Sequence, residues 1–169
     1  MTSEKQTTKV RVEDLDDLYQ QCAGLDVHEA SVTVCVVGGG KEGALAEFGA
    51  TTGELRQLGD WLRAQGAIQE ALESTGVYWM PVWQILETGG FQLRLATAKE
   101  VRNLPGRKTD LADAIWLASL LRKGLVRASF VPSAEVRAVL DQCRSHTSLT
   151  HDRTRIVQRI EKILEQVNF

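Results

Sequence analysis

The chain has 169 residues, of which 43% are hydrophobic and 25% are charged, and its formal net charge is −2. No apolar run approaches the ~20 residues of a membrane helix and no signal-peptide pattern follows Met1, which argues against a membrane or secreted protein and favours a cytoplasmic one. The three cysteines, Cys22, Cys35 and Cys143, are odd in number and widely spaced, which argues against a disulfide framework or a zinc site. We expect them to be small buried side chains.

The charge is unevenly distributed along the chain. Residues 1–98 carry 7 Lys and Arg against 14 Asp and Glu, whereas residues 99–169 carry 13 against 8. A basic half beside a group of acids is consistent with binding of a polyanion. Lys and Arg would hold the polyanion, and metal ions would neutralise the acids. A charged helix face that is merely solvated explains the same numbers, so charge alone leaves both readings open.

The chain order of the expected elements begins with a loose or short helical leader over residues 1–20. Apolar and β-branched runs then predict an antiparallel meander, and Thr51 to Glu54 resembles a capping box that opens a helix ending near Gly66. A second helix follows Tyr78 and closes at Gly89-Gly90. The expected strands are 21–27, 31–37, 44–50, 67–72 and 91–96.

Two further helices are expected in the basic half. Thr109 is a suitable N-cap for a helix with an apolar stripe that ends at Gly124. After a linker over 126–132, Ser133 is expected to cap a long helix with a nearly heptad seam. Three polar residues, Gln142, His146 and Arg153, interrupt that seam.

Four carboxylates fall where these elements would hold them rigidly: Asp26 in the first strand, Glu73 at the end of the fourth, and Asp110 and Asp113 in the first turn of a helix. The element order resembles the ribonuclease-H-like fold, an α/β architecture with a five-stranded mixed sheet and flanking helices. In that fold the fourth strand lies parallel to the first, so Asp26 and Glu73 become neighbours, and a helix at that edge can add the other two. Converging carboxylates suit Mg²⁺, with Mn²⁺ as a substitute, and two such ions ~4 Å apart assist phosphodiester cleavage.

Each acid also has an ordinary structural explanation. Asp26 and Glu73 can be polar ends of strands, and Asp110 and Asp113 complement the dipole of a helix start. Taken together with the element order, the metal site explains the set better than separate structural roles do.

At these motifs the chain resembles the amino-terminal part of the IS110/IS1111-type transposases, the DEDD recombinases related to the Piv invertases. The matching stretches are Gly24-Leu-Asp26-Val-His28, Glu73-Ser-Thr-Gly76-Val-Tyr78, Leu104-Pro-Gly-Arg-Lys-Thr-Asp110-Leu-Ala-Asp113-Ala and Leu120-Leu-Arg-Lys-Gly124-Leu-Val-Arg-Ala-Ser129-Phe-Val-Pro132. The resemblance implies a bacterial or archaeal protein with a RuvC-like nuclease domain over 21–125. It also implies a linker and a long helix over 126–169, which start a coiled-coil region, and a serine-bearing transposase domain that this sequence lacks.

The resemblance further implies DNA recombination directed by a structured, element-encoded guide RNA, with Asp26, Glu73, Asp110 and Asp113 as catalytic metal ligands. Glu29, where the family often has Lys, and Thr97-Ala98, where it often has Asn-Pro, depart from the pattern without touching a carboxylate. Ser74 is expected to be a turn or cap residue rather than a nucleophile.

Candidate nucleic-acid contacts come from cationic and histidine side chains near the acids. Arg107 and Lys108 directly precede Asp110 and are suited to phosphate oxygens. His28 follows Asp26 by two residues, and a phosphate contact and a structural hydrogen bond are equally compatible with it. Lys99 and Arg102 complete the set. The four tryptophans are expected to be core anchors.

Three rival functions remain. One is a stand-alone Holliday-junction resolvase of the RuvC type, using the same acids. Another is a non-catalytic fragment that binds RNA or forms a homodimer or higher oligomer through the long helix. The third, a sugar-kinase or actin-like ATPase, is disfavoured because Val-His-Glu after the first Asp is a poor phosphate cradle.

Overall fold

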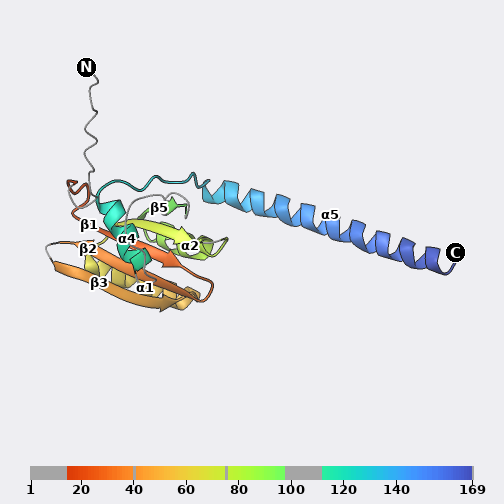
Figure 1. Ribbon diagram of the computed structural model, residues 1–169, viewed down its shortest axis with the longest axis horizontal. Coiled ribbons are helices and arrows are strands. Elements are labelled where there is room, and N and C mark those ends of the chain that lie inside the picture. The colour runs from red at the N-terminus through yellow and green to blue at the C-terminus, as the bar shows by residue number, and fades with distance from the viewer. Residues whose placement is uncertain (1–14, 40, 75, 98–111, 169) are drawn as a thin grey trace, which may run out of the picture. The chain divides into compact units, whose positions relative to one another are not determined.

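The computed structural model describes residues 15–39, 41–74, 76–97 and 112–168 of the chain. Its contacts divide it into two compact units, one ending at Phe130 and the other beginning at Val131. The first unit holds a mixed sheet with helices on both faces, and the second is one long helix (Figure 1).

The sheet of the first unit has the strand order β3-β2-β1-β4-β5. Strands β1, β2 and β3 form an antiparallel meander, whereas β4 is parallel to β1 and β5 is parallel to β4. This is the order expected for the ribonuclease-H-like fold, with the fourth strand beside the first and away from the second, so the predicted fold class is confirmed. The strands are β1 Gln21–Val27, β2 Ser31–Gly38, β3 Lys41–Gly49, β4 Gln69–Ser74 and β5 Gln92–Ala96.

Four of the five strands differ from the sequence prediction in their bounds, β2 and β5 by only one residue. Strand β3 begins at Lys41, three residues earlier than expected, and β4 begins at Gln69 and extends to Ser74. Strand β4 extends to Ser74 because it pairs with β1 as far as Val27. Glu73 therefore lies inside a paired strand instead of terminating it.

Helices α1 (Thr52–Gln65) and α2 (Trp79–Thr88) cover one face of the sheet, and α4 (Ala112–Arg122) covers the other (Figure 1). The predicted N-cap of α1, Thr51, is confirmed. The hydroxyl of Thr51 accepts a hydrogen bond from the backbone N–H of Glu54 at 3.4 Å and donates one to its carboxylate at 2.5 Å. The helix ends at Gly66, which adopts the left-handed conformation with φ of 76°, a geometry that glycine adopts without steric cost.

The core beneath α4 is formed by leucines of the helix and small residues of the strands. Leu117, Leu120 and Leu121 are each at most 1% exposed. They pack against Cys22, Ala71 and Ala96 of β1, β4 and β5. Burying one such leucine contributes about 1.5–3 kcal/mol, so this layer fixes α4 firmly over the central strands.

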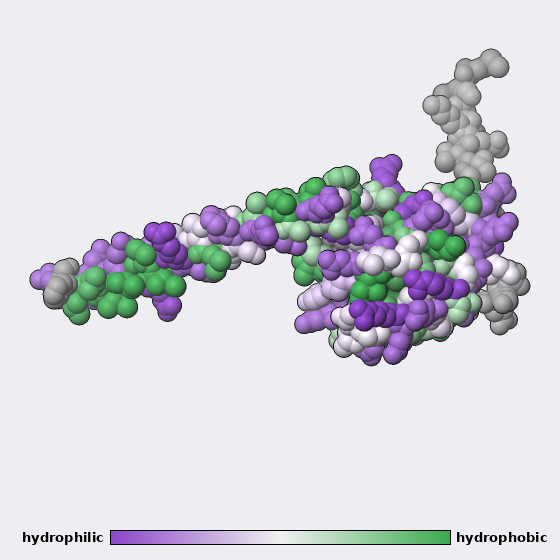
Figure 2. Space-filling view, turned by 180° about the vertical axis from the view of Figure 1, so that it is seen from behind, coloured by the Kyte–Doolittle hydropathy of each residue, from purple (hydrophilic) through white to green (hydrophobic). Residues whose placement is uncertain are grey.

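The second unit contains α5 (Ala134–Gln166), a helix of 33 residues in which no residue is buried. Its predicted start is confirmed, since the Ser133 hydroxyl accepts a hydrogen bond from the backbone N–H of Val136 at 3.5 Å. Figure 2 shows apolar surface along the C-terminal part of this helix, and Ile156, Ile160 and Ile163 are each more than half exposed there. None of the described helices is both long and apolar enough to cross a membrane.

The cysteines are only partly as expected. Cys22 and Cys35 are buried, with 0% and 3% exposure. Cys143 is exposed, so its expected burial is wrong: it lies on α5, in which no residue is buried.

Candidate metal centre

Asp26 and Glu73 lie directly opposite each other in the sheet. They are register partners in the parallel pair of β1 and β4, and neighbouring strands run about 4.8 Å apart. Both side chains are mostly shielded, because Asp26 is 14% exposed and Glu73 is 9% exposed. The backbone register therefore makes these two acids neighbours, as predicted.

Both acids lie on the face of the sheet that α4 covers. Side chains alternate along a strand, so Asp26 shares its face with Cys22 and Gly24. The thiol of Cys22 donates to the backbone oxygen of Ala118 in α4 at 3.5 Å. Glu73 likewise shares its face with Ala71, which packs against α4.

Asp113 lies in the first turn of α4, at the helix end nearer to the two acids. Along β1, Cys22 meets Ala118, whereas Gly24 meets both Ala118 and Ala114. Helix α4 therefore runs roughly antiparallel to β1, and its N-terminal end extends toward Asp26. Asp113 directly precedes Ala114, so the fold places this third acid at the same end of the sheet.

His28 is held by one of the candidate ligands. Its Nε2 lies 3.1 Å from Oδ2 of Asp26, and its side chain is 61% exposed. A hydrogen bond of this kind orients a metal-binding carboxylate. The exposed ring also leaves His28 accessible to an incoming phosphate.

The remaining predicted site residues, Asp110, Arg107, Lys108, Lys99 and Arg102, lie outside the described residues. Within the described part of the chain, no group of three or more His, Cys, Asp or Glu side chains is arranged to hold a metal ion. Asp26, Glu73 and Asp113 thus converge on one end of the sheet without forming a closed ligand cage among themselves.

The donor chemistry of this end suits Mg²⁺. Its three described acids supply hard carboxylate oxygens, which this ion prefers, and it commonly uses only one or two protein carboxylates plus water. The shielding of Asp26 and Glu73 strengthens their attraction for a cation, because the effective dielectric constant is lower inside a protein than in bulk water. The residues present therefore fit a divalent ion.

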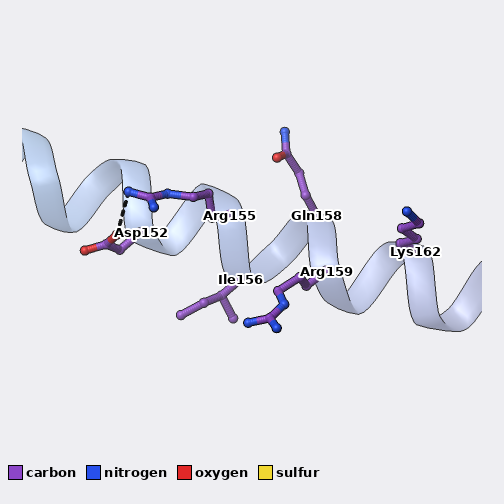
Figure 3. Close-up of a pocket in the computed structure, with 6 residues that line it drawn as sticks. All are labelled: Asp152, Arg155, Ile156, Gln158, Arg159 and Lys162. Carbon is purple, nitrogen blue, oxygen red and sulfur yellow. Dashed lines mark ion pairs between the residues drawn. The ribbon is translucent and has the colours of Figure 1, made fainter.

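A surface hollow elsewhere in the chain offers a weaker site. It is lined by Asp152, Arg155, Ile156, Gln158, Arg159 and Lys162, all from α5 (Figure 3). Asp152 and Arg155 form an ion pair there at 2.9 Å. Side chains of a single exposed helix do not enclose a ligand, so the carboxylate end of the sheet is the better candidate site.

The sequence predicted no role for two residues that have unusual surroundings in the structure. Gly24 lies against the backbone of α4, and a glycine inside a strand is the available signal of such a close approach. Glu70 of β4 is 0% exposed, and neither of its carboxyl oxygens has a hydrogen-bond partner among the described residues. Its position between the apolar residues Ile68 and Leu72 was the sequence signal for an inward-facing acid.

Comparison with known proteins finds similar solved structures and one matching family model. RuvC from Thermus thermophilus in complex with a Holliday junction substrate is 15% identical, with a TM-score of 0.46 over 66% of this chain and 100% of that one. A second structure of Thermus thermophilus RuvC is 15% identical, with a TM-score of 0.44 over 64% and 99%. No curated protein matches the sequence. The model of the IS110-type DEDD family, described as transposase, matches residues 23–169. The chain therefore belongs to the IS110-type DEDD transposase family.

Proposed function

We propose that this chain is the metal-dependent nuclease part of a DNA transposase, in which Asp26, Glu73, Asp110 and Asp113 hold Mg²⁺ for phosphodiester cleavage and strand transfer. The observation that carries the proposal is the register pairing of Asp26 with Glu73 on the face beneath α4. Separate structural roles for these acids do not require them to be opposite each other. Two like charges side by side are unfavourable unless a cation or a proton compensates them.

Each residue has a distinct part in the proposed chemistry. A bound divalent ion would polarise the scissile phosphate and lower the pKa of a coordinated water. Asp26 and Glu73 would fix the ion from two rigid strands, and Asp113 would add an oxygen from α4. His28 would keep the Asp26 carboxylate oriented through the 3.1 Å contact.

The proposed partners are DNA and a structured guide RNA encoded by the same element, in the cytoplasm of a bacterium or archaeon. The net positive charge of residues 99–169 supports a polyanionic partner. Arg107, Lys108, Lys99 and Arg102 remain the proposed backbone contacts, together with His28. In the resembled family, a separate serine-bearing domain completes the catalyst, and we propose that this chain supplies the acidic half.

Self-association through α5 is the remaining part of the proposal. Three isoleucines of the seam are more than half exposed along a helix with no buried residue. Such a row on a 3.5-residue repeat is covered when a second helix with the same repeat lies against it. A homodimer or higher oligomer built on α5 would provide that cover.

The test is Mn²⁺ binding by the chain, together with its Mg²⁺- or Mn²⁺-dependent cleavage of linear DNA. Asp26→Asn should abolish both, and Asp60→Asn, which changes an exposed acid of α1 paired with Arg63, should preserve them. Equal Mn²⁺ binding by both variants would refute the role of Asp26. Efficient cutting of Holliday junctions by this chain alone would instead favour the resolvase, and RNA binding with no cleavage under any condition would favour the non-catalytic fragment.

A further inference from the structure

Helix α4 crosses β1 at Gly24 with almost no space between the two backbones. A β-carbon built on Gly24 would lie 2.3 Å from the backbone oxygen of Ala114 and 2.4 Å from the backbone nitrogen of Ala118. Both distances are far below the separation of non-bonded atoms. The hydrogen atom of glycine is therefore what permits this crossing.

The atoms that would meet the added carbon cannot rotate away. They belong to the helix backbone, whereas at Gly59 of α1 the nearest atoms are side-chain carbons of Leu86 and Phe91 at 3.7 Å. Restoring even a 3.0 Å contact at Gly24 would move α4 and β1 apart by about 0.7 Å. An ordinary van der Waals contact, about 3.5–4.0 Å between carbon atoms, requires a larger shift.

The same crossing sets the position of the third acid relative to the first two. Asp113 directly precedes Ala114, and Asp26 lies two residues beyond Gly24 on the same face of β1. A movement of α4 away from Gly24 is thus a movement of Asp113 away from Asp26 and Glu73. Ligand constellations tolerate about 0.5 Å of misplacement, and 1 Å can cost about a hundredfold in rate.

We propose that Gly24 is a positioning residue of the metal centre. By allowing α4 to rest on the backbone of β1, it sets the span between the carboxylate of Asp113 and the Asp26–Glu73 pair. This role rests on the proposed metal-binding function of those acids. A glycine needed only for core packing would affect stability, but it would have no specific relation to the length of the Asp113 side chain.

The experiment compares Gly24→Ala with the matched control Gly59→Ala in this chain. Crystal structures without metal should show α4 displaced from β1 by about 0.7 Å or more in Gly24→Ala and unmoved in Gly59→Ala. Mn²⁺ titration followed by electron paramagnetic resonance should show at least a tenfold loss of affinity for Gly24→Ala and none for the control. If Gly24→Ala does not fold, Ala118→Val replaces it as the test variant. It adds bulk to the same crossing from the helix side and should show the same loss of Mn²⁺ affinity.

A suppressor separates positioning from packing. Asp113→Glu lengthens the ligand by one methylene group, so it should weaken Mn²⁺ binding in the wild-type background and restore it at least threefold in Gly24→Ala. An unmoved α4 in the Gly24→Ala crystal would overturn the proposal, as would a displaced α4 with wild-type Mn²⁺ affinity. Absence of Mn²⁺ binding by the wild-type chain would instead overturn the metal centre itself, together with the role of Gly24 in it.

Discussion

Asp26 and Glu73 face each other across two parallel strands that are adjacent in space but separated by two strands and a helix in the sequence. Their pairing follows from the position of β4 beside β1, which is a property of the whole sheet. The consequence is a pair of shielded carboxylates on the face of the sheet that α4 covers. Two like charges this close are the basis of the proposed cation site.

Metal binding should stabilise the fold through this pair. We predict that saturating Mn²⁺ raises the thermal midpoint of the wild-type chain, since a ligand at 100 times its dissociation constant contributes about 2.7 kcal/mol. Glu73→Gln should remove the shift, whereas Glu47→Gln, at an exposed position of β3, should retain it. The measurement is differential scanning calorimetry with and without the ion, and a full shift in Glu73→Gln would contradict the prediction.

Replacement of Arg107 and Lys108 by alanine should weaken DNA binding uniformly across sequences. Each lost phosphate contact should reduce the slope of log affinity against log salt concentration by about 1. Fluorescence anisotropy at several salt concentrations measures this slope. Arg56→Ala, which removes an exposed cation of α1, is the control, and an equal loss in that variant would indicate a nonspecific charge effect.

Self-association through α5 should depend on its apolar seam. Sedimentation velocity should show a concentration-dependent oligomer, and Ile160→Asp should yield a monomer because it places a charge in the seam. Gln158→Asp changes a residue that does not belong to the seam and should leave the oligomer intact. A wild-type chain that stays monomeric at high concentration would exclude this role for α5.

The buried carboxyl of Glu70 should make the protein less stable at alkaline pH. Desolvation by burial raises the pKa of Glu70 from 4.5 to about 8 in the folded state, so the folded protein keeps a proton that the unfolded chain releases. The contribution of Glu70 to stability should therefore be complete below pH 4.5, decline by about 1.4 kcal/mol per pH unit as pH rises toward 8, and level off above that value.

Glu70→Gln isolates this contribution, because glutamine has a similar shape and does not titrate in this range. Urea unfolding between pH 5 and pH 9 should show a smaller decline of stability in the variant than in the wild type. Trp83, whose indole N–H is also buried without a partner among the described residues, provides a fluorescence signal from the same side of the sheet. Identical pH profiles for the two proteins would show that Glu70 is already ionised in the folded state.

The sequence predicted those features that depend on local or periodic patterns. The N-cap at Thr51, the glycine stop at Gly66 and the order of helices and strands along the chain each have a local signature, and the structure confirms all of them. The bounds of β4 were less predictable, because its last residues are fixed by pairing with β1.

What the sequence did not predict depends on contacts between distant segments. The role of Gly24 required knowing that Ala114 and Ala118 lie against it, and the motif around Asp26 contains this glycine without indicating why. The exposure of Cys143 depends on whether another element covers α5. Burial of Glu70 depends on how distant segments pack over β4, although its place between two apolar residues was a usable hint.

The most direct test of the metal centre is a crystal structure of the chain grown with Mn²⁺, with the ion located by its anomalous signal. We predict a peak between the carboxylates of Asp26 and Glu73, about 2 Å from their oxygens, as expected for a small octahedral ion. An oxygen of Asp113, or a water bound to that oxygen, should face the same ion. A peak at another location, or none between Asp26 and Glu73 when Mn²⁺ saturates the crystal, would contradict the proposed metal centre.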